Sequence, residues 1–396
     1  MARVLAHIVI VALLGVIGSG CVATRIKQPE LLDRFHRHVT TADGWKVALF
    51  RVPPAGGVGE PHHGTPVLLA HGTAVNRMNY SHTGSDLGGY LASLGFDVWL
   101  LEYRGDRTSV PPSAKDWRQG RWTVEDFANQ DVPAALNAIQ AETGHDSVLW
   151  VGHSLGGLLG YITLQGPHAQ RVKGLVAIGA PGTFNHASDQ VGKVMHLRGL
   201  APKTGQFGLR PLAKLAKGAL RMAPDAPLFH MVFNADNLDV DAGASFVHPG
   251  FENVGSGVVQ QYIRWTDEGR LVSADGTVDY TAALPKITAP VFFIAGRVDH
   301  VVPPWTVRYA YDHVSSPDKQ WMVMGRGWGH RHDYGHGDLL IGDWVFEELF
   351  PSVGQWLVDH AVIPESPAIE LVVPSPEPSE APGEAATPDG VWGAPE

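Results

Sequence analysis

Cysteine is almost absent from this 396-residue chain. Cys21 is the only one, so no disulfide can form within the chain. Charged residues are also few, at 18%, and no long run of Lys or Arg offsets the net charge of −10. Because phosphate neutralisation needs clustered basic residues, nucleic acid is not expected as a partner. Apolar residues make up 44%, which allows a large buried core and argues against a disordered chain.

The single cysteine follows a segment with the features of an export signal. Arg3 supplies a positive charge, and residues 4–17 form an apolar stretch shorter than the roughly 20 residues that span a bilayer. Small residues 18–20 then lead directly to Cys21. Residues 1–20 resemble a bacterial lipoprotein signal peptide, although Gly18 stands where Leu is usual. We expect an exported lipoprotein of the cell envelope, anchored to a membrane through lipidated Cys21; an ordinary secretory signal and a retained N-terminal anchor are the alternatives.

Composition divides the rest of the chain into three parts. Residues 21–35 are predicted to be a polar tether, and residues 36–363 a folded domain. Residues 364–396 are rich in Pro and Glu and cannot bury enough apolar surface to offset their ordering entropy, so we expect them to be disordered. Within the domain, the regular pattern breaks between about 184 and 284. That stretch is predicted to be a cap inserted over the strand ends, with a decorated helix layer as the alternative.

The folded domain alternates short apolar runs with helical patterns. Continuous apolar runs are typical of strands covered on both faces, and their alternation with helices predicts a parallel sheet. One helix is predicted to begin at Thr123, with Asp126 completing its cap, to kink or start late at Pro133, and to end at Gly144. The predicted fold class is α/β, a mostly parallel central sheet with helices on both faces and an inserted cap. Strands are expected at 45–50, 67–70, 98–101, 147–151, 174–178, 291–294 and 321–324.

The sharpest signal is the pentapeptide Gly-His-Ser-Leu-Gly at residues 152–156. It has the form G-x-S-x-G, follows an apolar strand and precedes a helix-compatible run. This is the context of the nucleophile elbow of the α/β-hydrolase fold, a tight strand-to-helix turn that exposes a serine. The helix N-terminus behind Ser154 supplies positive potential where negative charge develops. Ser154 is therefore predicted to be a catalytic nucleophile.

A serine hydroxyl needs a base, and the base needs an acid to hold it. In this fold the chain order is Ser, acid, His. Asp299 lies just past the strand at 291–294, where the acid is expected. Three histidines follow the last strand, His330, His332 and His336, and spacing alone does not choose among them.

An oxyanion formed at this serine needs two backbone N–H donors. Leu155, the residue after the nucleophile, is one predicted donor. The other is expected in the loop after the strand at 67–70, with Thr73 as the best candidate. His71 in this loop is interpreted as structural.

Several further fragments make the chain resemble the acid lipase family of α/β hydrolases, the gastric and lysosomal type. They are Val-Thr-Thr-Ala-Asp-Gly at 39–44, Leu-Leu-Ala-His-Gly at 68–72, Gly-Phe-Asp-Val-Trp-Leu at 95–100 and His-Gly-Asp-Leu-Leu-Ile-Gly at 336–342. The last one is similar to the family's H-x-D-F-x-x-G ending and thereby selects His336 as the base. Leu155 departs from the Gln that the family usually has, and the cap is only weakly similar.

The resemblance implies a serine hydrolase that cleaves carboxylic esters, lipid esters foremost, through Ser154, Asp299 and His336 without cofactor or metal. A thioesterase, an acyltransferase or a polyester depolymerase could use the same triad, whereas a Cys-dependent polyester synthase is disfavoured by Ser154. Another alternative is a surface lipoprotein that is non-catalytic or binds metal, since His330, His332, His336 and Asp338 could ligate zinc. The expected partners are an ester or lipid substrate and the membrane surface.

Overall fold

The computed structural model describes residues 33–55, 64–82, 85–185, 203–224 and 226–361. The predicted signal peptide 1–20, Cys21 and the tail 364–396 lie outside these residues. Most of the predicted tether does too, but its last residue, Phe35, begins the first strand and packs its ring 5.6 Å from that of Phe50. None of the helices in the described part of the chain has the length and hydrophobicity needed to cross a bilayer.

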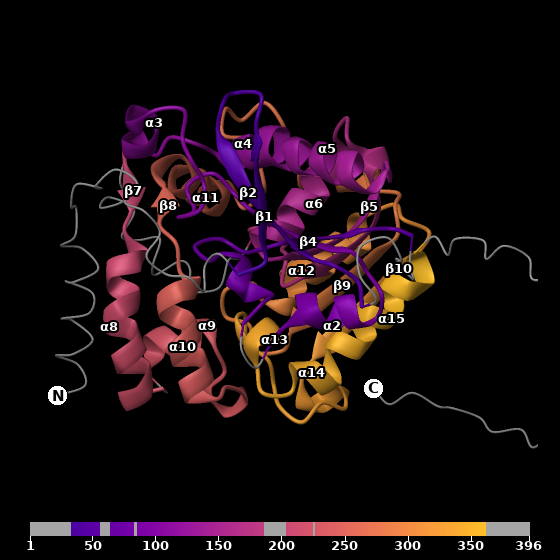
Figure 1. The fold of residues 1–396 in the computed structure, drawn as a ribbon. Helices are drawn as coiled ribbons and strands as arrows, with labels where there is room; N and C mark the ends of the chain where they lie inside the picture. The colour runs from indigo at the N-terminus through magenta and orange to yellow at the C-terminus, as the bar shows by residue number, and fades with distance from the viewer. Residues whose placement is uncertain (1–32, 56–63, 83–84, 186–202, 225, 362–396) are drawn as a thin grey trace, which may run out of the picture. The chain divides into compact units, whose positions relative to one another are not determined.

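The centre of the fold is an eight-stranded sheet with the strand order β1-β2-β4-β3-β5-β6-β9-β10 (Figure 1). Strand β2 runs antiparallel to both of its neighbours, and the other strand pairs are parallel, as predicted. The seven predicted strands are all present, and β1 is an additional edge strand. The strands are β1 (Phe35–Thr40), β2 (Lys46–Val52), β3 (Val67–Ala70), β4 (Val98–Glu102), β5 (Val148–His153), β6 (Val172–Ile178), β9 (Val291–Gly296) and β10 (Lys319–Met324).

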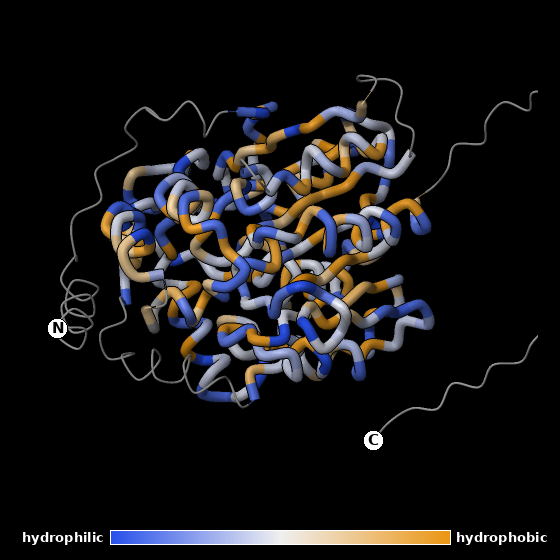
Figure 2. Tube along the Cα trace, turned by 90° about the horizontal axis from the view of Figure 1, so that it is seen from below, coloured by the Kyte–Doolittle hydropathy of each residue, from blue (hydrophilic) through white to orange (hydrophobic). Residues whose placement is uncertain are grey.

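Helices cover both faces of this sheet. Alternate residues of a strand point to opposite faces; accordingly Leu68 joins the core on the side of α5, α6 and α12, and Leu69 joins the core on the side of α2 and α15. Both cores are closed to solvent, and Figure 2 shows the hydrophobic segments running through the inside of the domain. These helices are α2 (Leu87–Ser93), α5 (Val132–Thr143), α6 (Leu155–Gln165), α12 (Pro304–His313) and α15 (Phe350–His360).

The helix predicted over 123–144 is present but interrupted. The Asp126 carboxylate accepts the Thr123 backbone N–H at 2.7 Å, as the predicted cap requires. A short α4 (Val124–Asp126) leads into a π-helical turn η3 (Phe127–Asp131) before α5 starts. Pro133 lies in the first turn of α5, where a missing N–H is tolerated. Gly144 ends the helix with φ +75°.

The described part of the predicted cap is mostly helical. Its two longest helices are α8 and α11. Helices α8 and α10 pack side by side at the left of Figure 1, where Leu220 and Phe229 share a small core with Ala244 and Val247. The cap elements are β7 (Gln206–Phe207), α8 (Leu209–Met222), α9 (Pro227–Val232), η6 (Ala235–Asn237), α10 (Val240–Gly250), β8 (Val254–Gly255) and α11 (Ser256–Glu268).

Shorter elements connect the strands and helices. Two of them border the site described below: η2 follows β3, and α13 lies in the chain beyond β10. The short elements are η2 (Arg77–Asn79), α3 (Ala114–Gln119), η4 (Ala169–Arg171), η7 (Leu284–Lys286), η8 (Arg326–Trp328), α13 (Asp338–Ile341) and α14 (Val345–Glu348).

Candidate active site

Ser154 occupies the turn between β5 and α6, at the carboxyl end of the sheet. Its backbone has φ +53° and ψ −117°, a conformation that non-glycine residues rarely adopt and that costs on the order of 1–3 kcal/mol. Its N–H donates to Ile178 at 2.8 Å, so the turn lies against the end of β6. This geometry is the strand-to-helix elbow that the pentapeptide predicts.

The glycines of the pentapeptide let this turn close. A Cβ at Gly156 would stand 1.8 Å from the carbonyl oxygen of Ala70, and one at Gly152 would stand 2.3 Å from the carbonyl oxygen of Gly156. Both contacts involve backbone atoms, which cannot rotate away as a side chain can. Only glycine at these two positions permits the close approach of β3, β5 and α6 around Ser154.

Asp299 and His336 form a buried pair beyond β9 and β10. The Asp299 Oδ2 atom lies 2.7 Å from His336 Nδ1, and the Asp299 side chain is fully buried. The other carboxylate oxygen accepts the backbone N–H groups of Val301 and Val302 at 2.8 and 2.7 Å. The carboxylate is thus held in place and orients the imidazole so that Nε2 faces away from Asp299.

His336 lies at the same strand ends as Ser154. A Cβ on Gly179, the residue after β6, would stand 3.4 Å from both Cε1 and Nδ1 of His336. The rings of His336 and His153, the residue before Ser154, have centroids 4.7 Å apart. The Ser154 hydroxyl itself makes no hydrogen bond among the described residues.

The two other candidate histidines point elsewhere. His330 Nδ1 lies 3.1 Å from both the backbone N and the carbonyl O of Gly325, and His332 lies beside the Arg326 guanidinium. Of the three histidines that spacing left open, His336 is the one in contact with Asp299.

Thr73 and Leu155, the predicted oxyanion donors, flank Ser154 from two sides. Leu155 begins α6, and Thr73 follows Gly72, where an added Cβ would stand 3.3 Å from Ser154 Cβ. Among the described residues, neither the Thr73 nor the Leu155 backbone N–H donates a hydrogen bond. Both N–H groups therefore have no acceptor within the described part of the chain.

His71 has a structural role, as interpreted from the sequence. It is buried, with Nε2 3.1 Å from Asp106 Oδ2 and Nδ1 2.9 Å from the Gly72 carbonyl oxygen. Burial alone would lower the pKa of His71, but the neighbouring Asp106 carboxylate raises it overall. The Asp106 carboxylate also accepts the Tyr103 N–H at 2.9 Å, so this pair ties the loop after β3 to the loop after β4.

The predicted cap is hydrogen-bonded to both loops of the site through residues 232–252. At the loop after β3, Glu252 N–H donates to the Ala74 carbonyl at 2.8 Å, and Asn76 N–H donates to Gly250 at 3.0 Å. At the loop that carries His336, Gly337 N–H donates to Val232 at 2.8 Å. Residues 232–252 of the cap thus bridge the two loops.

Asp338, a candidate zinc ligand in the sequence, serves this bridge instead. Its carboxylate accepts the backbone N–H groups of Asn234 and Gly335 and the side-chain amide of Asn237, at 2.9 to 3.1 Å. Burial raises the pKa of Asp338 to about 7. Within the described ranges, no group of three or more His, Cys, Asp or Glu side chains is arranged to hold a metal ion.

Three neighbours of the site escaped the sequence analysis as functional residues. Asn79 donates to His153 Nδ1 at 3.1 Å, and the Tyr262 hydroxyl lies 2.6 Å from Thr73 Oγ1. The Glu252 carboxylate accepts from Asn76, in the loop after β3, at 2.9 Å. The Gly-Val-Val-Gln-Gln-Tyr fragment at 257–262 resembles a family helix and was the one available signal for Tyr262.

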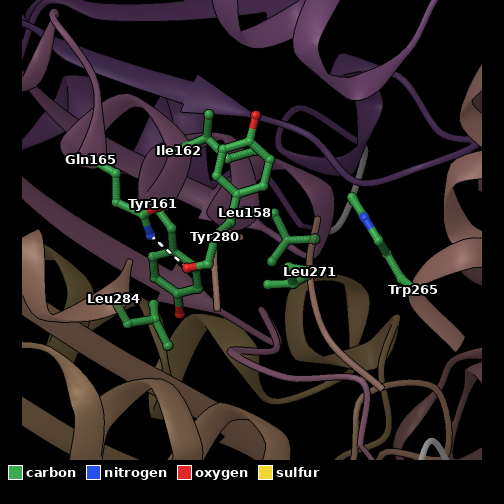
Figure 3. A pocket seen from close by; sticks show the side chains of 8 residues that line it. All are labelled: Leu158, Tyr161, Ile162, Gln165, Trp265, Leu271, Tyr280 and Leu284. Atoms are coloured by element: carbon green, nitrogen blue, oxygen red, sulfur yellow. Dashed lines mark hydrogen bonds between the residues drawn. The ribbon is translucent and has the colours of Figure 1, made fainter. Parts of the chain in front are cut away.

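A small hollow lies between α6, Trp265 of α11 and the segment that follows α11 (Figure 3). Its empty volume is about 230 Å³, which includes space open to solvent. The Gln165 side-chain amide reaches across it to the Tyr280 carbonyl oxygen at 3.1 Å. Its lining includes none of Ser154, Asp299 and His336, so we assign no substrate to it.

Comparison with known proteins gives a consistent result. A model of the alpha/beta hydrolase fold matches residues 65–330. The chain is 31% identical over 171 residues to human lysosomal acid lipase/cholesteryl ester hydrolase, covering 40% of this chain and 42% of the relative. It is 30% identical over 181 residues to triacylglycerol lipase 2 of Arabidopsis thaliana, covering 43% of each. The match thus spans about two fifths of these relatives, and it confirms the resemblance to acid lipases.

Solved structures share the fold at low sequence identity. A membrane phospholipase A described as a bacterial virulence factor superposes with a TM-score of 0.52 at 16% identity, covering 91% of this chain and 94% of that one. A hydrolase from Pseudomonas aeruginosa gives a TM-score of 0.51 at 16% identity, covering 82% of this chain and 97% of that one. At these identities the similarity concerns the fold alone.

Proposed function

Because the chain belongs to the α/β-hydrolase fold family, we propose that it hydrolyses carboxylic esters through an acyl-enzyme on Ser154. One observation carries the proposal. A serine with φ +53° stands between β5 and α6, while the Asp299–His336 pair, joined at 2.7 Å, lies at the neighbouring strand ends. Among the described residues, Ser154 is the one serine with a positive φ.

In the first half-reaction, Ser154 Oγ attacks the ester carbonyl carbon while His336 Nε2 takes the serine proton. The carbonyl π electrons move onto oxygen, and the N–H groups of Thr73 and Leu155 stabilise that charge. His336 then protonates the departing alcohol oxygen as its bond to carbon breaks. Asp299 keeps the proton on Nδ1 and stabilises the imidazolium.

Water repeats the sequence in the second half-reaction. His336 removes a proton from water, the hydroxide adds to the acyl carbon, and Ser154 leaves with the proton returned by His336. Catalytic hydrogen bonds often tighten only when substrate is bound. The contact between Ser154 and His336 Nε2 is therefore expected to form in the substrate complex.

Lipid esters are the proposed substrate class. The relatives at about 30% identity are lipases by name. The region matched by the model of the fold family, residues 65–330, includes the elbow. The predicted cap is only weakly similar in sequence to the acid lipases, and caps in this fold shape the substrate pockets. A thioester, an acyl acceptor other than water or a polyester would use the same triad, so the substrate must be established by assay.

The site of action is proposed to be a membrane surface. The N-terminal segment resembles a lipoprotein signal, and Cys21 would carry the acyl chains after cleavage at residue 20. More than one acyl chain gives stable anchoring. Mass spectrometry of the mature N-terminus tests this: a diacylglyceryl-modified Cys21 supports it, and an unmodified or uncleaved terminus contradicts it.

The enzymatic proposal is tested with a panel of p-nitrophenyl esters from short to long acyl chains, together with triolein and a cholesteryl ester. Wild-type protein is expected to hydrolyse members of the panel, and the preferred chain length defines the acyl pocket. Ser154→Ala should lower kcat by several orders of magnitude. A Ser154→Ala protein that keeps most of the activity contradicts the assignment, as does a folded wild-type protein that cleaves nothing in the panel.

A further inference from the structure

The Thr73 side chain forms a hydroxyl pair with a residue of the cap. Its Oγ1 lies 2.6 Å from the hydroxyl of Tyr262 on α11, 189 positions away in the sequence. Thr73 follows directly on Gly72, which packs against Ser154. The hydroxyl pair therefore lies at the loop that is expected to supply an oxyanion donor.

One of the two hydroxyl protons is not needed for the hydrogen bond between Thr73 and Tyr262. Two hydroxyls carry two protons, and their mutual hydrogen bond uses one. Among the described residues, neither oxygen makes another hydrogen bond. Burial raises the pKa of Tyr262 to about 12, so the phenol keeps its proton at neutral pH. One hydroxyl proton is thus available to an acceptor from outside the protein.

Aromatic neighbours hold Tyr262 in position. Its ring centroid lies 4.8 Å from that of Trp265 and 6.0 Å from that of Phe184. Trp265 is itself fully buried and donates its indole N–H to the Val272 carbonyl oxygen at 2.6 Å. A donor fixed in this way needs little reorganisation when charge develops nearby, which is the condition for effective electrostatic stabilisation.

The competing explanation is that the hydroxyl pair only stabilises the contact between the predicted cap and the loop after β3. The same loop is already bonded to the cap through Ala74 and Asn76, whose partners are backbone groups of residues 250–252. A further tie of one hydroxyl to another would add only about 1 kcal/mol. A role in catalysis explains better than added stability why the hydroxyl pair lies beside the elbow.

We propose that Thr73 Oγ1–H donates a third hydrogen bond to the oxyanion formed on Ser154, and that Tyr262 orients it by donating its own proton to Thr73 Oγ1. Thr73 then contributes a backbone and a side-chain donor, and Tyr262 is a positioning residue. No proton is transferred: both hydroxyls keep theirs while negative charge grows on the substrate oxygen. A chain of two hydrogen bonds also polarises the terminal donor. The inference rests on the proposed ester hydrolysis.

The test compares Thr73→Val, Thr73→Ser and Tyr262→Phe on the best p-nitrophenyl ester. Loss of one oxyanion donor typically lowers kcat by about 10²–10³-fold, and a third donor is expected to account for about 10–100-fold. Thr73→Val should therefore lower kcat by that factor with KM within about twofold, and Thr73→Ser should restore kcat to within a few-fold. Tyr262→Phe should lower kcat less than Thr73→Val, and the double variant no more than Thr73→Val alone.

Two further measurements separate catalysis from structure. Affinity for a boronic acid, which mimics the tetrahedral intermediate, should fall in Thr73→Val in parallel with kcat. Thr266→Val is the matched control and should leave kcat unchanged, because the one described partner of the Thr266 hydroxyl is the Tyr262 carbonyl on the same helix. Unchanged kcat in Thr73→Val, a loss confined to KM or thermal stability, or no rescue by Ser overturns the third donor.

Refutation of the third oxyanion donor can be distinguished from refutation of the proposed ester hydrolysis. If wild-type protein cleaves esters and Ser154→Ala does not, a silent Thr73→Val refutes only the third donor. If Ser154→Ala is as active as wild type, the function proposed for the site is wrong and the hydroxyl pair has no oxyanion to serve.

Discussion

His153 Nε2 donates a hydrogen bond to the backbone carbonyl oxygen of His336 at 3.1 Å, across 183 positions of sequence. The other ring nitrogen, Nδ1, accepts from the Asn79 side-chain amide at 3.1 Å. The residue before the proposed nucleophile thus supports the backbone of the proposed base. Burial lowers the pKa of His153 well below its usual range, and the charge of His336 adds a smaller decrease. The His153 imidazole that holds the His336 backbone is therefore neutral.

The neutral His153 predicts acid sensitivity of the fold. The folded-state pKa lies below the unfolded value of about 6.5, so below that pH the unfolded chain binds a proton that the folded chain does not. The contribution of His153 to stability is fully present above pH 6.5 and is lost as pH falls. The expected slope is about 1.4 kcal/mol per pH unit between roughly pH 6 and the lowered pKa. Urea unfolding at several pH values measures it.

His153→Gln is the matched variant for this prediction, since a glutamine amide can donate to the same carbonyl without titrating. The pH slope of the unfolding free energy should be smaller than in wild type by about one proton. Equal pH slopes in the two proteins would mean that His153 is protonated in the folded state, which contradicts the neutral imidazole described here.

Asp299→Asn should preserve the fold and remove most of the activity. An amide in place of the carboxylate can donate to Nδ1 and so favours the wrong imidazole tautomer, which costs about 10⁴-fold in kcat in a comparable triad. The matched control is Asp359→Asn on α15, which should leave kcat unchanged, because this exposed carboxylate has Gln355 as its one partner among the described residues. Activity of Asp299→Asn within tenfold of wild type argues for another acid.

Glu252 is predicted to be the anchor of the cap. Its carboxylate is 1% exposed and accepts from Arg107, Arg210 and Asn76 at 2.8, 2.7 and 2.9 Å. Glu252→Ala leaves two guanidinium groups without their shared partner and should cost about 3–5 kcal/mol in the free energy of unfolding. Chemical denaturation followed by tryptophan fluorescence gives the number.

The control for Glu252 is Asp312→Ala, which removes an exposed partner of Arg308 on α12. That change should cost less than about 0.5 kcal/mol. If Glu252→Ala is as mild as Asp312→Ala, the cap is held by its backbone hydrogen bonds and the buried carboxylate is dispensable.

Two glycine-to-alanine changes, at Gly156 and at Gly218, should change the stability of the protein in opposite directions. At Gly156, the new Cβ would stand 1.8 Å from the Ala70 carbonyl oxygen, so α6 cannot stay in place and folding or activity should fail. At Gly218, within α8, an added Cβ meets no atom within 4 Å. Alanine there should raise the unfolding free energy by about 0.5–1 kcal/mol. Thermal melts of the two variants check both signs, and a stable, active Gly156→Ala would contradict the described elbow.

Much of this architecture could be predicted because the determining signals are local. The strand at 67–70 was predicted with its observed bounds, since its four residues are apolar and end at His71. The elbow needs only five residues between a strand and a helix. The comparisons confirm the predicted α/β-hydrolase fold and the resemblance to acid lipases.

The edge strand β1 shows where local signals fail. Its sequence, Phe-His-Arg-His-Val-Thr, is mostly polar because one side of an edge strand faces solvent, and Phe35 was assigned to the tether. The strand forms through pairing with β2 and a ring contact between Phe35 and Phe50. Neither contact is visible in a single strand's composition.

The residues of the candidate site could be predicted only in part from the sequence, for a related reason. Spacing could not separate His330, His332 and His336, because all three lie within seven residues, and the choice of His336 needed a family resemblance. The contacts of Thr73 with Tyr262 and of His153 with Asn79 span 189 and 74 positions. They depend on how the cap and η2 fold back over the strand ends, which no local pattern encodes.

The most direct test of the proposed nucleophile is covalent labelling of the folded protein with a fluorophosphonate, followed by peptide mass spectrometry. Such a probe reacts with a serine hydroxyl only where a base and an oxyanion site activate it. The account predicts a single adduct on Ser154 that abolishes esterase activity and is absent in Ser154→Ala. Full inactivation with the adduct on another residue, or an active esterase that never labels at Ser154, would contradict it.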